Sequence, residues 1–146
     1  MNLKQALKRK NRLVGLIAET YKNAFLYNSM EEGVERPYST KDSIEKWMKL
    51  TDELIELKCK IQTANNSVNN LIFRLSELKS QAKLLKELNC ASGIIHVSSH
   101  RGGDKQVIKT AELGIIERDQ MVAKMESEIE QIQEKLDQYN HETLIS

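Results

Sequence analysis

The sequence predicts an all-α protein: an elongated antiparallel helical bundle, coiled-coil-like in its pattern, with a short β-hairpin between the third and fourth helices. Three observations support this fold class. Apolar residues recur at steps of three and four through four long segments. Helix breakers are few, with one Pro and six Gly in 146 residues. Between residues 92 and 114, a glycine pair flanked by β-branched residues interrupts the helical pattern, and the whole chain, 1–146, is expected to form a single domain.

The first helix is expected over residues 2–28. Its apolar seam is widened by flanking apolar residues, which is typical of a bundle rather than of a two-stranded coiled coil. Residues 29–39 follow as a loop punctuated by Gly33 and Pro37. The seam positions, taken in order, are Leu3, Leu7, Lys10, Val14, Ile17, Tyr21 and Ala24, with Ala6, Leu13 and Leu16 beside them.

The second helix is expected over residues 41–64, with Ser39 or Thr40 as its N-cap. Trp47 lies in the apolar period of this helix, so we expect it to be a buried anchor. The expected buried face consists of Ile44, Trp47, Met48, Leu54, Ile55, Ile61 and Ala64, with Leu57 beside it.

An asparagine-rich stretch at residues 63–70 predicts the turn of a helical hairpin, because Asn favours caps and turns over helix interiors. The alternative is one continuous helix of about 48 residues with a polar middle. The third helix is expected over residues 67–90, where Asn89 and Gly93 favour a C-terminal stop.

The interrupting segment predicts a β-hairpin over about 94–110, with Gly102 and Gly103 at its turn. A lone two-stranded hairpin is marginally stable in water, so it must pack on the bundle or pair with hairpins of other subunits. An anion-binding nest is the alternative for the glycine pair, but the Walker spacing is absent. The fourth helix is expected over residues 112–143, with apolar residues at three-four spacing and many acids elsewhere.

The charge is divided between the two ends of the chain, although the net value is only +1. Residues 1–28 carry six basic residues against one Glu, and residues 112–146 carry nine acidic residues against three basic ones. These segments should attract each other within the chain or between subunits. Binding of nucleic acid is the less favoured reading, because the acidic counterpart is in the same chain and aromatic residues are scarce.

No pattern of catalytic, cofactor-binding or metal-ligating residues emerges, so we expect that the protein is not an enzyme. The two histidines of the hairpin lack the helical spacing and the carboxylates of a metal site. Cys59 and Cys90 are expected to be buried, inert thiols. The residues we consider for interactions are basic or imidazole side chains of the first helix and the hairpin: Lys8, Arg9, Arg12, His96, His100 and Arg101.

The chain contains no apolar run long enough for a transmembrane helix and no signal-peptide pattern, so we expect a cytoplasmic protein that does not contact membranes.

Four segments, in order, are similar to motifs of one family: "MNLKQALKRKNRLVGLI", "EEGVERP", "ELIELKCKIQTANNS" and "LDQYNHET". In these the chain resembles the septicolysin-like family of small helical bacterial proteins, whose function is uncharacterised. The chain departs from the family where His141 replaces an aromatic residue, and where no Gly lies between Asn65 and Leu71. The resemblance implies an all-helical fold and no established catalytic residues.

Together these features predict a non-enzymatic, homo-oligomeric helical protein that acts by assembly or by docking another protein. One alternative is a nucleic-acid-associated accessory protein that uses the basic first helix together with Arg74, Lys79, Lys83, Lys86 and Arg101. Another is a structural component of a phage or mobile element.

Overall fold

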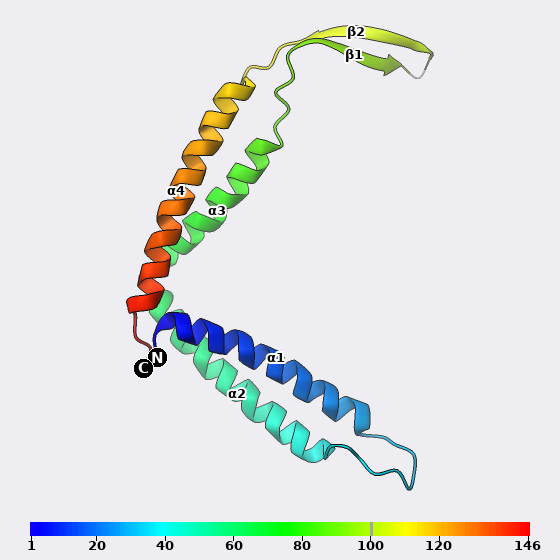
Figure 1. Ribbon diagram of the computed structural model, residues 1–146, viewed down its shortest axis with the longest axis vertical. Coiled ribbons are helices and arrows are strands. Elements are labelled where there is room, and N and C mark those ends of the chain that lie inside the picture. Colours follow the sequence, from blue (N-terminus) through cyan, green and yellow to red (C-terminus); the bar gives the residue numbers. More distant parts are fainter. Residues whose placement is uncertain (100) are drawn as a thin grey trace. The chain divides into compact units, whose positions relative to one another are not determined.

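The protein is mostly helical, with one short antiparallel β-hairpin between the third and fourth helices (Figure 1). The computed structural model describes residues 1–99 and 101–146. The predicted order of elements is confirmed within these residues. The elements, in chain order, are α1 (Leu3–Tyr27), α2 (Thr40–Asn65), α3 (Asn69–Lys86), β1 (Gly93–Ser99), β2 (Gly103–Lys109) and α4 (Ile115–Glu142).

The chain divides into two compact units. One unit comprises Met1–Asn69 and Asp137–Ser146, and therefore contains α1, α2 and the last turns of α4. The other comprises Asn70–Leu136 and contains nearly all of α3, the hairpin and most of α4. Each unit has its own line of buried apolar side chains.

Side chains cap both helices of the first unit at their N-termini. The Asn2 side chain accepts a hydrogen bond from the Gln5 backbone N–H, and the Gln5 side chain accepts one from the Asn2 N–H, which completes a capping box. Ser39 caps α2 by accepting a hydrogen bond from the Asp42 N–H, as one of the two predicted caps.

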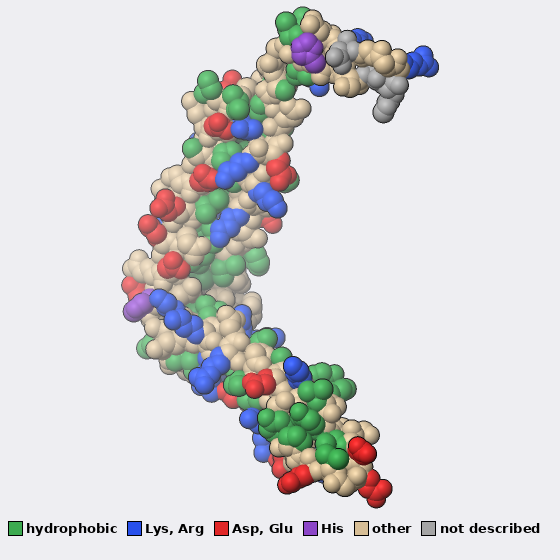
Figure 2. Space-filling model, turned by 45° about the vertical axis from the view of Figure 1, so that its right-hand side comes forward, with side chains coloured by type: hydrophobic (Ala, Val, Ile, Leu, Met, Phe, Trp, Pro, Cys, Tyr) green, Lys and Arg blue, Asp and Glu red, His purple; other side chains and the backbone are tan. Residues whose placement is uncertain are grey.

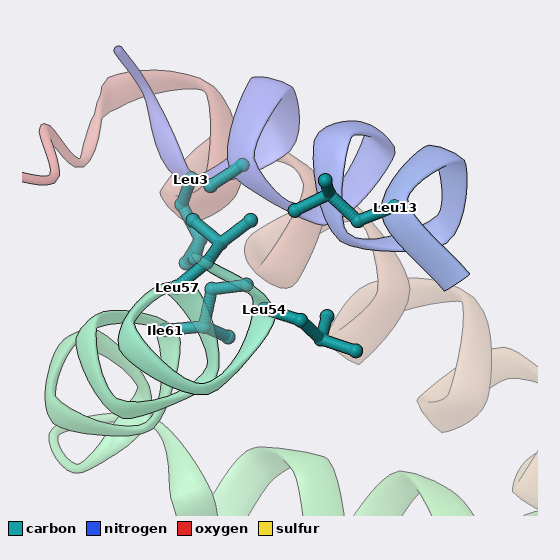
Figure 3. Close-up of a cluster of buried hydrophobic side chains, with 6 residues drawn as sticks. Leu3, Leu13, Leu54, Leu57 and Ile61 are labelled. Carbon is teal, nitrogen blue, oxygen red and sulfur yellow. The ribbon is translucent and has the colours of Figure 1, made fainter. Parts of the chain in front are cut away.

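The core of the first unit lies between α1 and α2, which run side by side (Figures 1 and 3). Leu3 and Ala6 are completely buried, and they sit at the start of α1, opposite the C-terminal half of α2. Partly buried residues, including Tyr139 and Ile145 from the end of the chain, pack against this cluster. Its buried members are Leu3, Ala6, Leu13, Leu54, Leu57 and Ile61.

The two ends of the chain are hydrogen-bonded together at this core. The Leu3 N–H donates to the Thr143 carbonyl at 2.8 Å, and the Ile145 N–H donates to the Met1 carbonyl, also at 2.8 Å. The Tyr139 hydroxyl donates to the Ala64 carbonyl at the end of α2 at 2.7 Å. Since that hydroxyl has only one hydrogen, the Ser67 hydroxyl must donate to the Tyr139 oxygen, 2.7 Å away.

The predicted asparagine-rich turn is confirmed. Helix α2 ends at Asn65, and the Val68 N–H bonds the Asn65 carbonyl at 2.9 Å in the tight turn before α3. The alternative prediction of one continuous helix through this stretch is therefore wrong.

In the second unit, α3 and α4 bury one apolar line each. The buried residues of α3 are Leu75, Leu78 and Ala82, and those of α4 are Val122, Ile132 and Leu136. All six lie in the predicted three-four apolar pattern, which here buries fewer than one residue per helical turn.

Helix α3 ends at Lys86, four residues before the predicted end, and α4 begins at Ile115 rather than at residue 112. The Asn89 side chain accepts a hydrogen bond from the Ala91 N–H at 3.0 Å, a local turn that competes with helix. The Arg118 guanidinium donates to the carbonyls of Lys86 and Leu88, so it satisfies the end of α3 from α4. Arg36 does the same for α1 by donating to the carbonyls of Tyr27 and Asn28.

The hairpin pairs β1 with β2 over seven residues each, from Gly93 opposite Lys109 to Ser99 opposite Gly103. Gly102 in the turn has φ +75°, a conformation that L side chains rarely adopt, which explains the glycine there. No residue of the hairpin that the structure describes is buried.

Replacing Tyr139 with Phe removes the hydroxyl that joins the ends of α2 and α4. We expect the free energy of unfolding to fall by about 1–2 kcal/mol, because the Ala64 carbonyl and the Ser67 hydroxyl lose a partner. Urea denaturation followed by circular dichroism measures this. Tyr27→Phe is the control, since the Tyr27 hydroxyl makes no hydrogen bond in the described part of the chain; an equal loss in both variants contradicts the assigned role.

Replacing Leu3 with Ala should destabilise the protein more strongly. Leu3 is completely buried, so we expect a loss of about 2–5 kcal/mol from the lost transfer free energy and the cavity left behind. Leu26→Ala serves as the matched control on the same helix, because Leu26 is exposed. The midpoint temperature of thermal unfolding should be clearly lower for Leu3→Ala than for Leu26→Ala. Similar midpoints would show that burial of Leu3 does not stabilise the fold.

Candidate interaction surfaces

Three of the residues considered for interactions lie together on α1. Lys8, Arg9 and Arg12 line an open groove between α1 and α2, with Leu13, Leu16 and Leu50 as its apolar floor. Arg9 is held in an ion pair with Glu53 of α2. Lys8 and Arg12 make no hydrogen bond or ion pair within the residues that the structure describes. The groove therefore presents two free positive charges above an apolar floor.

The other candidates belong to the second unit. His96 lies in the middle of β1 and is exposed. Arg101 lies in the turn of the hairpin and is exposed, while His100 falls outside the described residues. Lys8, Arg9 and Arg12 thus belong to one unit, and His96 and Arg101 to the other.

Two acidic side chains of α4 form ion pairs with basic side chains of α3. Arg74 pairs with Glu128 at 2.5 Å, and Lys86 pairs with Glu126 at 2.5 Å. The hydrogen bond from Arg74 lowers the pKa of the Glu128 carboxyl below its ordinary value. Two of the basic α3 residues considered for nucleic-acid binding are therefore already neutralised by acids of the same chain.

The structure reveals an exposed surface made largely of residues that the sequence pattern assigned to the core, with Phe25 as an addition to them. We call it the apolar face, and it consists of Val14, Tyr21 and Phe25 of α1 with Ile44, Trp47, Met48 and Ile55 of α2. Phe25 is 68% exposed and Met48 is 58% exposed. Figure 2 shows hydrophobic side chains gathered near the end of the α1–α2 pair that lies beside the acidic connecting loop.

Aromatic contacts join the two helices across the apolar face. The ring centroids of Tyr21 and Phe25 are 4.2 Å apart, and those of Tyr21 and Trp47 are 5.7 Å apart. Val14, Tyr21 and Phe25 follow one another at steps of seven and four along α1, so they share one side of that helix. Ile44, Met48 and Ile55 do the same along α2, next to Trp47.

The expectation that these residues form the core was wrong for most of the apolar face. Trp47 is half-buried rather than a buried anchor, and Val14 and Tyr21 of the predicted seam are exposed. The reason is geometrical, since a helix that packs on a single partner buries one line of side chains. The apolar stripe of α1 is wider than contact with one helix covers, so part of it stays exposed.

The prediction for the two cysteines was also wrong in part. Cys59 is exposed on α2, and Cys90 lies half-buried in the loop after α3. Cys59 falls on the outer side of α2 because the facing positions of that helix are taken by Leu54, Leu57 and Ile61.

Neither a metal centre nor a membrane span emerges from the described residues. Groups of three or more His, Cys, Asp and Glu side chains that could hold a metal ion are not found among them. None of the described helices combines the length and hydropathy that a bilayer crossing requires.

Comparison with protein-family models, curated proteins and solved structures finds no match to this chain. The interaction surfaces therefore have to be interpreted from their own chemistry.

The Arg74–Glu128 ion pair between α3 and α4 should affect the titration of the Glu128 carboxyl. In Arg74→Gln, the Glu128 carboxylate loses its hydrogen-bond donor, so its pKa should rise toward the ordinary value. Because the folded-state pKa of Glu128 is lowered, its stabilising effect is full above the unfolded pKa and disappears as pH falls through the folded one. NMR titration of the Glu side chains measures the change. Lys79→Gln, also on α3 but without an ion pair, should leave Glu128 unchanged; a Glu128 titration that is the same in both variants contradicts the pairing.

Proposed function

We propose that this protein is a non-enzymatic, homo-oligomeric helical protein that acts by assembly, and that two copies join through the apolar face. The single observation that carries the proposal is the exposure of this aromatic-rich face, from Val14 to Phe25 on α1 and from Ile44 to Ile55 on α2. Contiguous exposed apolar surface of this kind marks interaction sites on soluble proteins. Tyr and Trp are also enriched among the residues that dominate binding energy at interfaces.

A second copy of the chain is the occupant that fits the apolar face best. The face belongs to a helical hairpin, and two such hairpins related by a two-fold axis supply the four helices of a bundle. In that arrangement each helix of the hairpin has two neighbours, which is what the wide apolar stripes of α1 and α2 require. The antiparallel bundle expected from the sequence would then form between chains.

Within the first unit, the described residues leave this face uncovered. Phe25, Met48 and Ile55 remain more than half exposed, while α3 and α4 have buried apolar lines of their own in the second unit. The resemblance to the septicolysin-like family is consistent with a helical, non-catalytic protein, and it supports the proposal to that extent.

The nucleic-acid alternative has weaker support. Lys8 and Arg12 have no ion pair among the described residues, but Arg74 and Lys86 are paired with Glu128 and Glu126, so two of the basic residues named for this alternative are already neutralised. The alternative predicts binding that weakens steeply with salt, whereas an apolar interface strengthens or stays constant.

The double variant Phe25→Lys with Met48→Lys tests the assembly. We expect wild-type protein at micromolar concentration to have a mass that is a multiple of 16.8 kDa by light scattering after size exclusion. The variant should dissociate, with the association constant reduced by about 100-fold or more, because two charges must be buried in an apolar interface. Lysine is chosen because a positive charge near the C-terminus of α1 does not oppose the helix dipole.

Leu26→Lys is the matched control. Leu26 follows Phe25 directly on α1 and is also exposed, but its side chain leaves the helix about 100° away. This variant should keep the wild-type mass, and circular dichroism should show equal helix content in all variants. A wild-type monomer of 16.8 kDa, or a double variant that assembles like wild type, overturns the proposal.

A further inference from the structure

The hairpin presents a strand edge that lacks the usual protection. One edge of β1 pairs with β2, and no strand of the described chain lies along the other edge. Natural proteins protect such edges with charged side chains, above all Lys. Strand β2 follows this rule with Lys105 and Lys109, whereas β1, with the sequence "GIIHVSS", contains no Lys, Arg, Asp or Glu.

Among its described residues, the hairpin also lacks the buried side chains that would stabilise it as two strands. Ile94 and Ile108 are cross-strand partners and are 66% and 79% exposed. Ile95 and Val107 form the neighbouring pair on the other face and are only half-buried. A two-stranded hairpin in water is marginally stable, and a third strand with an apolar face is what usually stabilises one.

We propose that β1 pairs in antiparallel orientation with the β1 of a second copy, forming a four-stranded sheet in the order β2, β1, β1, β2. The inference builds on the proposed function, self-assembly, but it uses a surface separate from the apolar face. Antiparallel pairing follows from a two-fold axis that runs through the sheet, which makes both edges identical. It also forms the more stable ladder.

Strand β1 is complementary to itself in this orientation. All seven residues overlap when His96, the middle residue of Gly93–Ser99, lies opposite its own copy. Ile95 then faces Val97 of the partner strand, a pairing of β-branched residues that stabilises sheets, and Ile94 faces Ser98. No side chains of like fixed charge oppose each other along the edge. The uncharged edge thus accepts a second copy of itself.

Two separate self-contacts in one chain have a consequence for the assembly. Each contact by itself gives a two-fold dimer. If the two contacts engage different partners, each chain links two others, and the assembly grows beyond a dimer into a closed ring or an open chain. This would make the hairpin the connector between bundles formed by the apolar face.

Disulfide trapping tests the pairing and its register. In a Cys59→Ser, Cys90→Ser background, His96→Cys places one thiol opposite its own copy across the new strand pair. Directly opposite Cβ atoms in antiparallel strands are about 4.5–5.5 Å apart, close enough for a disulfide after a small adjustment. We expect a covalent dimer on a non-reducing gel, formed at least 10-fold faster than in the controls under the same glutathione redox buffer.

Two controls lie on the same face of the hairpin as His96. Gln106→Cys changes its cross-strand partner on β2, and three strand spacings, about 14 Å, would separate the two copies of this residue. Ile94→Cys stays on β1, but its own copy lies four residues along the strand, again about 14 Å away. A mixture of Ile94→Cys and Ser98→Cys chains should crosslink as fast as His96→Cys, because these two positions face each other.

The outcomes are distinct. Fast trapping of His96→Cys and of the Ile94→Cys and Ser98→Cys mixture, with slow controls, supports the pairing. Trapping of His96→Cys no faster than that of Gln106→Cys overturns it. The same measurement in the Phe25→Lys, Met48→Lys background separates this inference from the proposed function. Trapping that persists there while the apolar-face contact is lost shows an independent contact, and a hairpin that fails to trap leaves the helical dimer untouched.

Discussion

The structure of the first unit depends on the junction where the start of α1, the end of α2 and the end of α4 meet. Leu3 is completely buried there, and its backbone N–H binds the Thr143 carbonyl. Tyr139 adds a hydroxyl that contacts the Ala64 carbonyl and Ser67. These contacts join residues more than 70 positions apart, so they give the helical hairpin a closed end that local helix formation could not provide. The buried side chains become sparser away from this junction.

That gradient explains why the apolar face exists. Near the junction, α1 and α2 bury Leu3, Ala6, Leu57 and Ile61, and the last turn of α4 adds Tyr139 as a third partner. Farther along, α1 and α2 are the two helices that pack within the first unit, and a pair of helices covers one side of each apolar stripe. The large aromatic residues on the remaining side, Tyr21 and Phe25, contact each other and half-buried Trp47. A helical neighbour from a second copy would cover them by the same packing that operates at the junction.

Some acidic side chains of α4 form ion pairs with basic side chains of α3 in the same unit. The Arg74–Glu128 and Lys86–Glu126 pairs cross from α3 to α4, and Arg118 reaches back to the end of α3. These are exposed pairs, which contribute little to stability by themselves, but they favour one orientation of the two helices. Among the described residues, the basic side chains of α1 form one ion pair, between Arg9 and Glu53. In these contacts the acids of α4 pair with basic residues of α3, and the attraction between the first and last helices that the sequence suggests stays a prediction.

By itself, the sequence determined the elements of this protein. Three-four spacing placed all four helices, the asparagines placed the turn after Asn65, and Gly102 with its β-branched flanks placed the hairpin. These signals are local, because backbone preference and side-chain period act within a few residues. Only the tertiary structure decided which side of each stripe is buried. Val14, Tyr21 and Trp47 carry the same pattern as Leu13 and Leu54, yet they differ in burial because α1 and α2 turn one line toward each other. Burial depends on how many neighbours a helix has, and that number is set by contacts distant in the chain, such as Leu3 with Thr143.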